Sequence, residues 1–235
     1  MTTPLGEHGS RFELVELDLL ATYAGKRPPF PLRVPSAGRL AGEREALLRA
    51  AGGSLAERGL ATADEPVGVA ADLVAALRGY HSSIDLVLAR QGAVTGFVAL
   101  PHGDHAVLCG QPIDGTPGPV TVTTVAYDAL ADTLASFLPE MAAAPAMPIT
   151  LPPGADGDQT AVEALATVLP SVTGRGQFGV LRGPGGERPL ELSWLDGPDG
   201  RVRIDHDDRG WVSVNPLRHN EIVRVLREAA ALARQ

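Results

Sequence analysis

The chain has 235 residues, of which 44% are hydrophobic and 20% charged, and its formal net charge is −8 at pH 7. This length and composition suffice for a buried core in one large domain or two small halves. Lysine and arginine gather on no single stretch, which disfavours a duplex-binding role because phosphate contacts need clustered cations. The single cysteine, Cys109, excludes an intrachain disulfide, and its apolar neighbours predict a buried structural thiol.

The first residues show neither the basic region nor the apolar core of a signal peptide. No apolar run approaches the roughly 20 residues that span a bilayer. We therefore expect a cytoplasmic protein without direct membrane insertion.

Helical periodicity marks three segments in the first third of the chain, at 12–24, 39–58 and 67–79. Gly25 is suited to end the first helix in a left-handed conformation. The alternation at the start of that helix would also suit a short strand. The proline-studded PFPLRVP at 29–35 predicts an extended edge strand.

Two series of short strands follow, each closed by a helix. We expect the first series at 84–90, 93–101, 106–111 and 120–125, with a helix at 127–139. The proline-rich 139–153 predicts a crossing segment that contains the extended MPITLP, and a helix is expected over 159–169. We expect the second series at 178–182, 190–195, 201–205 and 211–215. A final helix then runs to about Ala233, with Asn215 as its N-cap and Pro216 as its first residue.

The order of extended segment, helix, four strands and helix thus occurs twice. This repetition predicts an α+β fold with two similar halves, each an antiparallel β-meander with flanking helices, around a central sheet. We place the halves at residues 1–138 and 139–235, related by a pseudo-two-fold axis and together forming one compact domain.

GRGQFG at 174–179 has the spacing of a dinucleotide-binding fingerprint, and Asp196 follows at about the distance of a ribose-binding carboxylate. The fingerprint requires a strand before it and a helix after it, so that a helix N-terminus meets the pyrophosphate. Here the motif follows a predicted helix and leads into a strand. We interpret Gly174 as the residue after a helix, Gly176 as loop, and Gly179 as a bulge or close backbone approach, and we expect no nucleotide cofactor.

Other candidate sites also have simpler interpretations. The aspartates of 196–210 fail the spacing of a calcium loop and are typical of hairpin turns. His102 and His105 have H-x-x-H spacing, but Pro101 and Gly103 predict a turn rather than a zinc-binding helix. We therefore expect no metal site.

Catalytic signatures are also missing from the sequence, which contains no G-x-S-x-G, H-E-x-x-H or Walker loop. We predict no catalytic residues, although catalytic groups can lie far apart in a chain. Trp194 and Trp211 are interpreted as core anchors beneath the final helix, with exposure as binding anchors as the alternative.

Several stretches across the chain resemble the EspG-type proteins of ESX (type VII) secretion in actinobacteria. They are LVELDLLATYAG, PFPLRVPSAGR, AERGL, IDLVLARQGAVTGFVALPHGDHAVLCG, GRGQFGVLRG, LSWLDGPDGRVRI and GWVSVNP. The resemblance implies a cytosolic, non-enzymatic chaperone with a pseudo-two-fold fold around a central sheet. It also implies a partner, the apolar tip of a helical PE–PPE dimer or of a related ESX substrate such as a WXG-like protein.

The resemblance places partner contacts in the first meander and its hairpin loops. On that basis we expect them at Gln91, Phe97, Leu100, His102 and Asp104. Two alternatives stay open. One is a small-molecule enzyme or ligand-binding protein with a site between the halves, and the other is a scaffold that forms a homodimer when free.

Overall fold

The computed structural model describes residues 5, 9–145, 148–153, 163, 166, 171–183 and 186–235. Among these residues, ten strands form one antiparallel sheet. The strands are β1 (Ser10–Phe12), β2 (Ser82–Arg90), β3 (Ala93–His102), β4 (His105–Pro112), β5 (Val120–Ala126), β6 (Ile149–Leu151), β7 (Gly174–Arg182), β8 (Glu187–Gly197), β9 (Gly200–His206) and β10 (Val212–Pro216). The described helices are α1 (Leu14–Ala24), α2 (Ala41–Glu57), α3 (Val69–Gly79), η2 (Tyr127–Ala129), α4 (Leu130–Ser136) and α6 (His219–Ala233).

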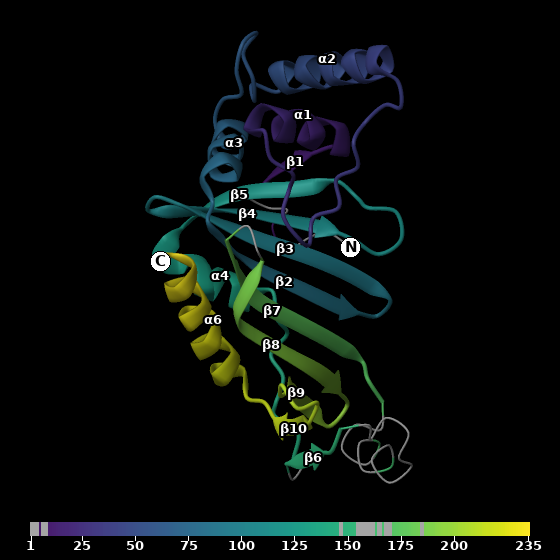
Figure 1. Cartoon of the computed structure of the whole chain (residues 1–235), viewed down its shortest axis with the longest axis vertical. Helices are drawn as coiled ribbons and strands as arrows, with labels where there is room; N and C mark the ends of the chain where they lie inside the picture. Colours follow the sequence, from purple (N-terminus) through teal and green to yellow (C-terminus); the bar gives the residue numbers. More distant parts are fainter. Residues whose placement is uncertain are drawn as a thin grey trace.

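The strands follow the order β1-β5-β4-β3-β2-β7-β8-β9-β10-β6, so both predicted meanders belong to one sheet (Figure 1). They meet where β2 pairs with β7 over nine residues, from Ser82 opposite Arg182 to Arg90 opposite Gly174. The two sides of the sheet have the same strand order when they are followed away from this junction. Each side consists of a four-stranded meander and then a short strand from a distant segment, β1 on one side and β6 on the other. The mixed α+β fold around a central antiparallel sheet is confirmed. A superposable pair of halves, and their division at residues 138 and 139, stay predictions.

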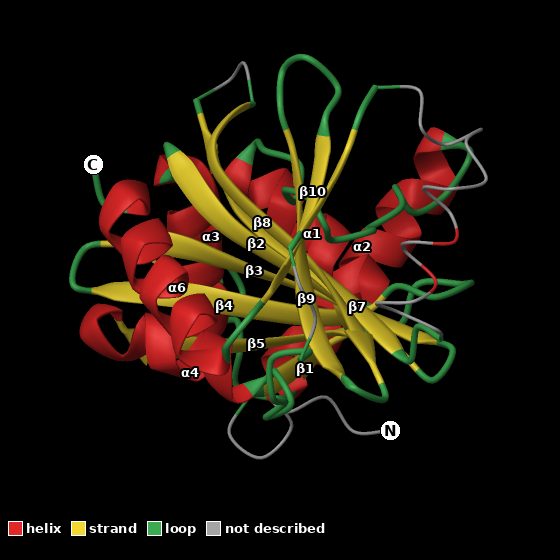
Figure 2. Ribbon diagram, turned by 90° about the horizontal axis from the view of Figure 1, so that it is seen from below, coloured by secondary structure: helices red, strands yellow, loops and turns green. Residues whose placement is uncertain are grey.

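One face of the sheet, which we call the α6 face, packs against α4 and α6. Figure 2 shows these two helices side by side over the strands. Successive side chains of a strand point to opposite faces, so Leu86, Phe97 and Phe178 enter the core on this face. Helix α6 contributes Ile222 and Leu226 to it, and all five side chains are at most 1% exposed.

The opposite face, which we call the α3 face, is covered by α1 and α3 over the first meander. Val98 and Leu100 of β3 pack there with Leu73 and Leu77 of α3. Cys109 lies in the same core, and burial raises the pKa of its thiol to about 12. The prediction of a buried structural thiol is confirmed.

Most predicted elements are present, and the differences have local causes. Residues 10–12 form β1 before α1 begins, and Gly25 ends α1 with a φ of 65°, as expected. The edge strand predicted at 29–35 is wrong, because this segment forms a turn in which the Leu32 amide donates to the Pro29 carbonyl. MPITLP does contain a strand, β6, which pairs with β10.

The N-terminus of the last helix was also predicted wrongly. Asn215 and Pro216 end β10 opposite Arg203 and Val202, so they cannot cap the helix. The N-cap is Arg218, whose amide donates to the Glu221 carboxylate over 2.9 Å. The helix predicted at 159–169 lies outside the described residues except for Glu163 and Ala166. Among the helices described, none combines the length and apolar character needed to cross a membrane.

Candidate sheet groove

A hollow of about 550 Å³ lies on the α3 face, over the strands beyond the β2–β7 junction. We call it the sheet groove. Its walls are mostly aliphatic and come from Val87, Ala89, Val94, Leu151, Leu195, Ile204, Val212 and Val214.

The register of the sheet gathers these side chains. Residues directly opposite each other on paired strands point to the same face. Val87 lies opposite Gln177, Gln177 opposite Ser193, Ser193 opposite Ile204, and Ile204 opposite Val214. One row of side chains therefore crosses five strands, from β2 to β10, with two uncharged polar residues at its centre.

The described helices of the α3 face do not cover the groove. Helix α3 packs on β3, β4 and β5, and Figure 1 shows α1, α2 and α3 at that end of the molecule. Val87, Leu195 and Ile204 are consequently only partly buried, whereas Val98 and Leu100 beneath α3 have no exposure. Among the described elements, no helix takes the place of α3 over the second meander.

Charged side chains border the groove at the next row of paired residues, two positions along each strand from the row that begins at Val87. Arg188 donates to both carboxylate oxygens of Asp85, at 2.5 and 2.6 Å, and to Glu191 at 2.9 Å. Burial raises the pKa of Asp85 to about 6, although Arg188 acts in the opposite direction. The exposed ring of Phe30 lies 5.9 Å from the Arg188 guanidinium carbon. These side chains would form one edge of the surface that a ligand in the groove contacts.

The chemistry of the groove is that of a binding surface. Gln177, Ser193 and Arg175 supply hydrogen-bonding groups, and the lining drawn from the described residues includes no Asp, Glu, His or Cys. An aliphatic wall with a few polar groups suits the burial of apolar side chains.

The five residues predicted to contact a partner do not form one site. Gln91 is exposed at the β2–β3 turn, whereas His102 and Asp104 lie near the β3–β4 turn. These turns are at opposite ends of β3, about 30 Å apart at the usual rise of a strand.

Phe97 and Leu100 lie inside the protein, with exposures of 1% and 0%. Phe97 stacks on Phe137, with a ring separation of 4.5 Å, and Leu100 packs in the α3-face core. The expectation that these two side chains offer a contact surface is therefore corrected by their burial. Sequence reasoning missed the sheet groove, whose alternating aliphatic residues look like those of any buried strand.

The remaining candidate motifs have structural explanations. GRGQFG lies within β7, so the assignments of Gly174 as a residue following a helix and of Gly176 as loop are wrong. Asp196 is buried and binds Arg201, with distances of 2.6 and 3.1 Å. No three His, Cys, Asp or Glu residues of the described part lie close enough together to hold a metal ion.

The two tryptophans differ in their surroundings. Trp194 is 2% exposed in the core of the α6 face, so its interpretation as a core anchor is confirmed. Trp211 is 41% exposed, so the same interpretation is wrong for it. The Trp211 amide donates to Asp207 over 2.8 Å, which holds this residue in the turn before β10.

Comparison with known proteins agrees with this architecture. The model of the EspG family matches residues 13–228. No curated protein matches the chain. A solved structure with a TM-score of 0.62 and 13% identity covers 94% of this chain and 95% of its own. That structure is EspG5, the type VII secretion system chaperone of Mycobacterium tuberculosis, in complex with a PE25–PPE41 dimer. At this identity, the likeness establishes a shared fold.

Proposed function

The chain belongs to the EspG family, and we propose that it is a cytoplasmic, non-enzymatic chaperone of a type VII secretion system. In this proposal it binds the apolar end of a helical substrate, a PE–PPE heterodimer or a related WXG-like protein, and keeps that substrate soluble. The observation that carries the proposal is the open, aliphatic sheet groove. The complex of the similarly folded EspG5 with a PE–PPE dimer supports it.

The shape and the apolar character of the sheet groove favour a helical protein as its ligand. Monomeric proteins rarely leave a broad apolar surface uncovered unless it binds something. A helix presents apolar side chains every three or four residues, which suits docking into an apolar groove. The sheet provides a rigid floor, because each groove strand from β2 to β10 is paired on both sides.

A small-molecule ligand is the second candidate. The groove volume of about 550 Å³ lies within the range of ligand pockets, roughly 300–1,000 Å³, and the groove crosses the junction of the two meanders. Catalysis would need acid, base or nucleophilic groups that converge on the ligand, whereas Gln177, Ser193 and Arg175 provide the polar groups here. Binding of a helical protein therefore has the stronger support.

Co-expression tests the chaperone proposal. PE–PPE pairs from the same genome should remain soluble and copurify with the wild-type chain. Val87→Glu, which places a carboxylate in the groove, should abolish copurification while the thermal unfolding midpoint stays close to that of wild type. Val87 is suitable because it is only partly buried, so the new carboxylate can reach water.

Leu47→Glu is the matched control. It makes the same kind of change at a 40% exposed residue of α2, away from the groove (Figure 1). We expect this variant to bind like the wild type. Unchanged binding by Val87→Glu, or loss of binding only in Leu47→Glu, would remove the groove from the proposal.

A further inference from the structure

The row of side chains that forms the floor of the sheet groove continues into the first meander. Gly96 of β3 lies directly opposite Val87, and Gln111 of β4 lies directly opposite Gly96. Both residues therefore belong to the same face of the sheet as the groove. A Cβ atom at Gly96 would lie 2.6 Å from Cγ of Pro31, so Pro31 covers β3 at this position. The segment that contains Pro31 thus closes the row at β3.

Polar contacts fix this segment on the sheet. The fully buried side chain of Gln111 accepts a hydrogen bond from the Arg33 amide over 2.7 Å and donates one to the Arg33 carbonyl over 3.0 Å. The Leu32 amide donates to the Pro29 carbonyl, which closes a turn. We call residues 29–33 the end turn. Because it is tied to the sheet at Pro31 and at Arg33, the end turn has a defined position before any partner binds.

Phe30 is a central residue of the end turn, and its side chain is exposed to solvent. It is 55% exposed, whereas the other four phenylalanines of the chain are buried or half-buried. The ring lies 5.9 Å from the guanidinium carbon of Arg188, which binds Asp85. Asp85 lies two positions before Val87 on the same face of β2. The exposed ring therefore stands beside the groove.

We propose that Phe30 is an anchor residue of the partner interface, against which an apolar side chain at the leading end of the docked helix packs. This inference rests on the proposed function and adds where in the groove the helix ends. A helix that lies along the row from β10 towards β2 reaches the end turn, because Pro31 closes the row there. Aromatic residues are enriched at the centre of interfaces. A ring that is already held in place also loses little conformational freedom on binding.

Truncation of the ring tests the inference. The probe is the PE–PPE heterodimer that copurifies with the wild-type chain, and the readouts are Kd and the dissociation rate. Phe30→Ala should weaken binding about tenfold, mainly through faster dissociation, as expected when an apolar anchor is lost. Phe30→Tyr keeps the ring and should bind like the wild type. The thermal unfolding midpoint should stay close to that of wild type in both variants, because the side chain is exposed.

Tyr23→Ala is the matched control. Tyr23 is a 42% exposed aromatic residue of α1 that borders a hollow between α1 and α2, outside the sheet groove. This variant should keep the affinity of the wild type. A photoreactive benzophenone amino acid at position 30 should crosslink to the heterodimer on irradiation, whereas the same group at position 23 should not.

The outcomes separate this inference from the proposed function. If Val87→Glu abolishes binding while Phe30→Ala keeps wild-type affinity, the groove is the docking site and the anchor role of Phe30 is wrong. Binding without any crosslink from position 30, or an equal loss of affinity in Tyr23→Ala, would overturn the inference in the same way. If Val87→Glu binds like the wild type, the docking site itself is wrong.

Discussion

Gly176 illustrates why individual residues of this sequence are easily misinterpreted. In GRGQFG the glycines resemble a loop motif, yet Gly176 lies in β7 directly opposite Trp194. A Cβ atom at this position would lie 2.0 Å from Cζ2 of the indole, far inside contact distance. The glycine therefore makes room for the large aromatic side chain that anchors the α6-face core.

Gly176→Ala should consequently destabilise the protein. The added methyl group displaces the buried Trp194 ring, and overpacking of this kind costs about 1–3 kcal/mol. The free energy of unfolding, measured with urea, checks this expectation. Gly53→Ala is a suitable control, because a Cβ there meets nothing within 4 Å, and alanine in a helix is favoured by up to about 1 kcal/mol over glycine. Equal effects of the two substitutions would contradict the packing argument.

Helix α2 depends on polar contacts more than on its own apolar face. The helix buries only Ala51 and Leu55, and Leu47 is 40% exposed. Two buried acids of α1 fix its ends instead. Asp18 accepts from Arg44 at 2.5 and 3.2 Å, and Glu16 accepts from Arg58 at 3.0 and 3.1 Å.

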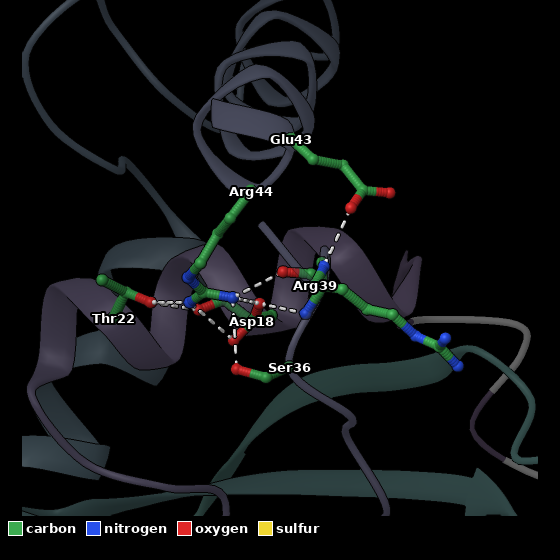
Figure 3. A network of polar contacts seen from close by, with 7 residues as sticks. Asp18, Thr22, Ser36, Arg39, Glu43 and Arg44 are labelled. Carbon is green, nitrogen blue, oxygen red and sulfur yellow. Dashed lines mark hydrogen bonds and ion pairs between the residues drawn. The ribbon is translucent and has the colours of Figure 1, made fainter. Parts of the chain in front are cut away.

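The contacts around Arg44 extend to the segment before the helix. Its guanidinium also donates to Ser36, Thr22 and the Ala37 carbonyl, as Figure 3 shows for the labelled side chains. The Ala37 amide donates to Asp18 over 2.8 Å, so the same carboxylate holds both the helix and the segment that leads into it.

Arg44→Met should therefore loosen one element and leave the rest of the fold intact. The aliphatic stem remains while the contacts to Asp18 are lost, so we expect severalfold faster amide exchange over residues 36–57 and unchanged exchange in β2 and β7. Hydrogen–deuterium exchange followed by mass spectrometry provides the measurement. Arg49→Met removes only an exposed pair with Glu45 and should leave exchange unchanged. A rise spread evenly over the sheet would show that Arg44 stabilises the whole fold rather than one helix.

Helices and strands were predicted correctly where the hydrophobic period of the sequence matches the pattern of buried residues in the structure. Helix α3 and strands β2 to β5 bury the residues that their periodicity places inside. The prediction failed where tertiary packing decides. PFPLRVP has the composition of an edge strand, but Pro31 packs against Gly96 of β3. A Cβ added to Gly96 would lie only 2.6 Å from Cγ of Pro31, and the segment pairs with no strand. Asn215 and Pro216 continue a strand because Arg203 and Val202 pair with them.

The sheet groove is a property of the whole molecule, which is why the sequence did not reveal it. Val87 and Ile204 alternate with core residues as any strand residue does, and only the positions of the helices decide which face is left open. Residues about 120 apart line the same groove because β2 and β7 join the two meanders. The two-meander architecture could be predicted from repetition of the pattern, whereas the uncovered surface could not.

The Asp85–Arg188 ion pair links the two meanders across their junction. Asp85 belongs to β2 and Arg188 to β8, and the guanidinium crosses the intervening β7 at Gly179, where a Cβ would lie 2.7 Å from Nη1. Asp85 is almost wholly buried, and Arg188 and Glu191 are the charged groups that act on it. The pair should therefore make the stability of the joined sheet depend on pH.

The sign follows from the direction of the pKa shift. Burial raises the pKa of Asp85 from 3.8 to about 6, Arg188 opposes that rise, and Glu191 reinforces it. Between these two values the folded protein binds more protons at this site than the unfolded chain. Its stabilising contribution is therefore present at acid pH and is lost as the pH rises through about 6.

Asp85→Asn removes this titration, and comparison with the wild type isolates it from other acidic groups. The stability of the wild type relative to the variant should be greater at mildly acid than at neutral pH, by about 2 kcal/mol, since one pKa unit corresponds to about 1.4 kcal/mol. Urea unfolding of both proteins at each pH measures the difference. A wild-type advantage that instead grows towards neutral pH would mean that attraction by Arg188 outweighs the cost of burying the charge.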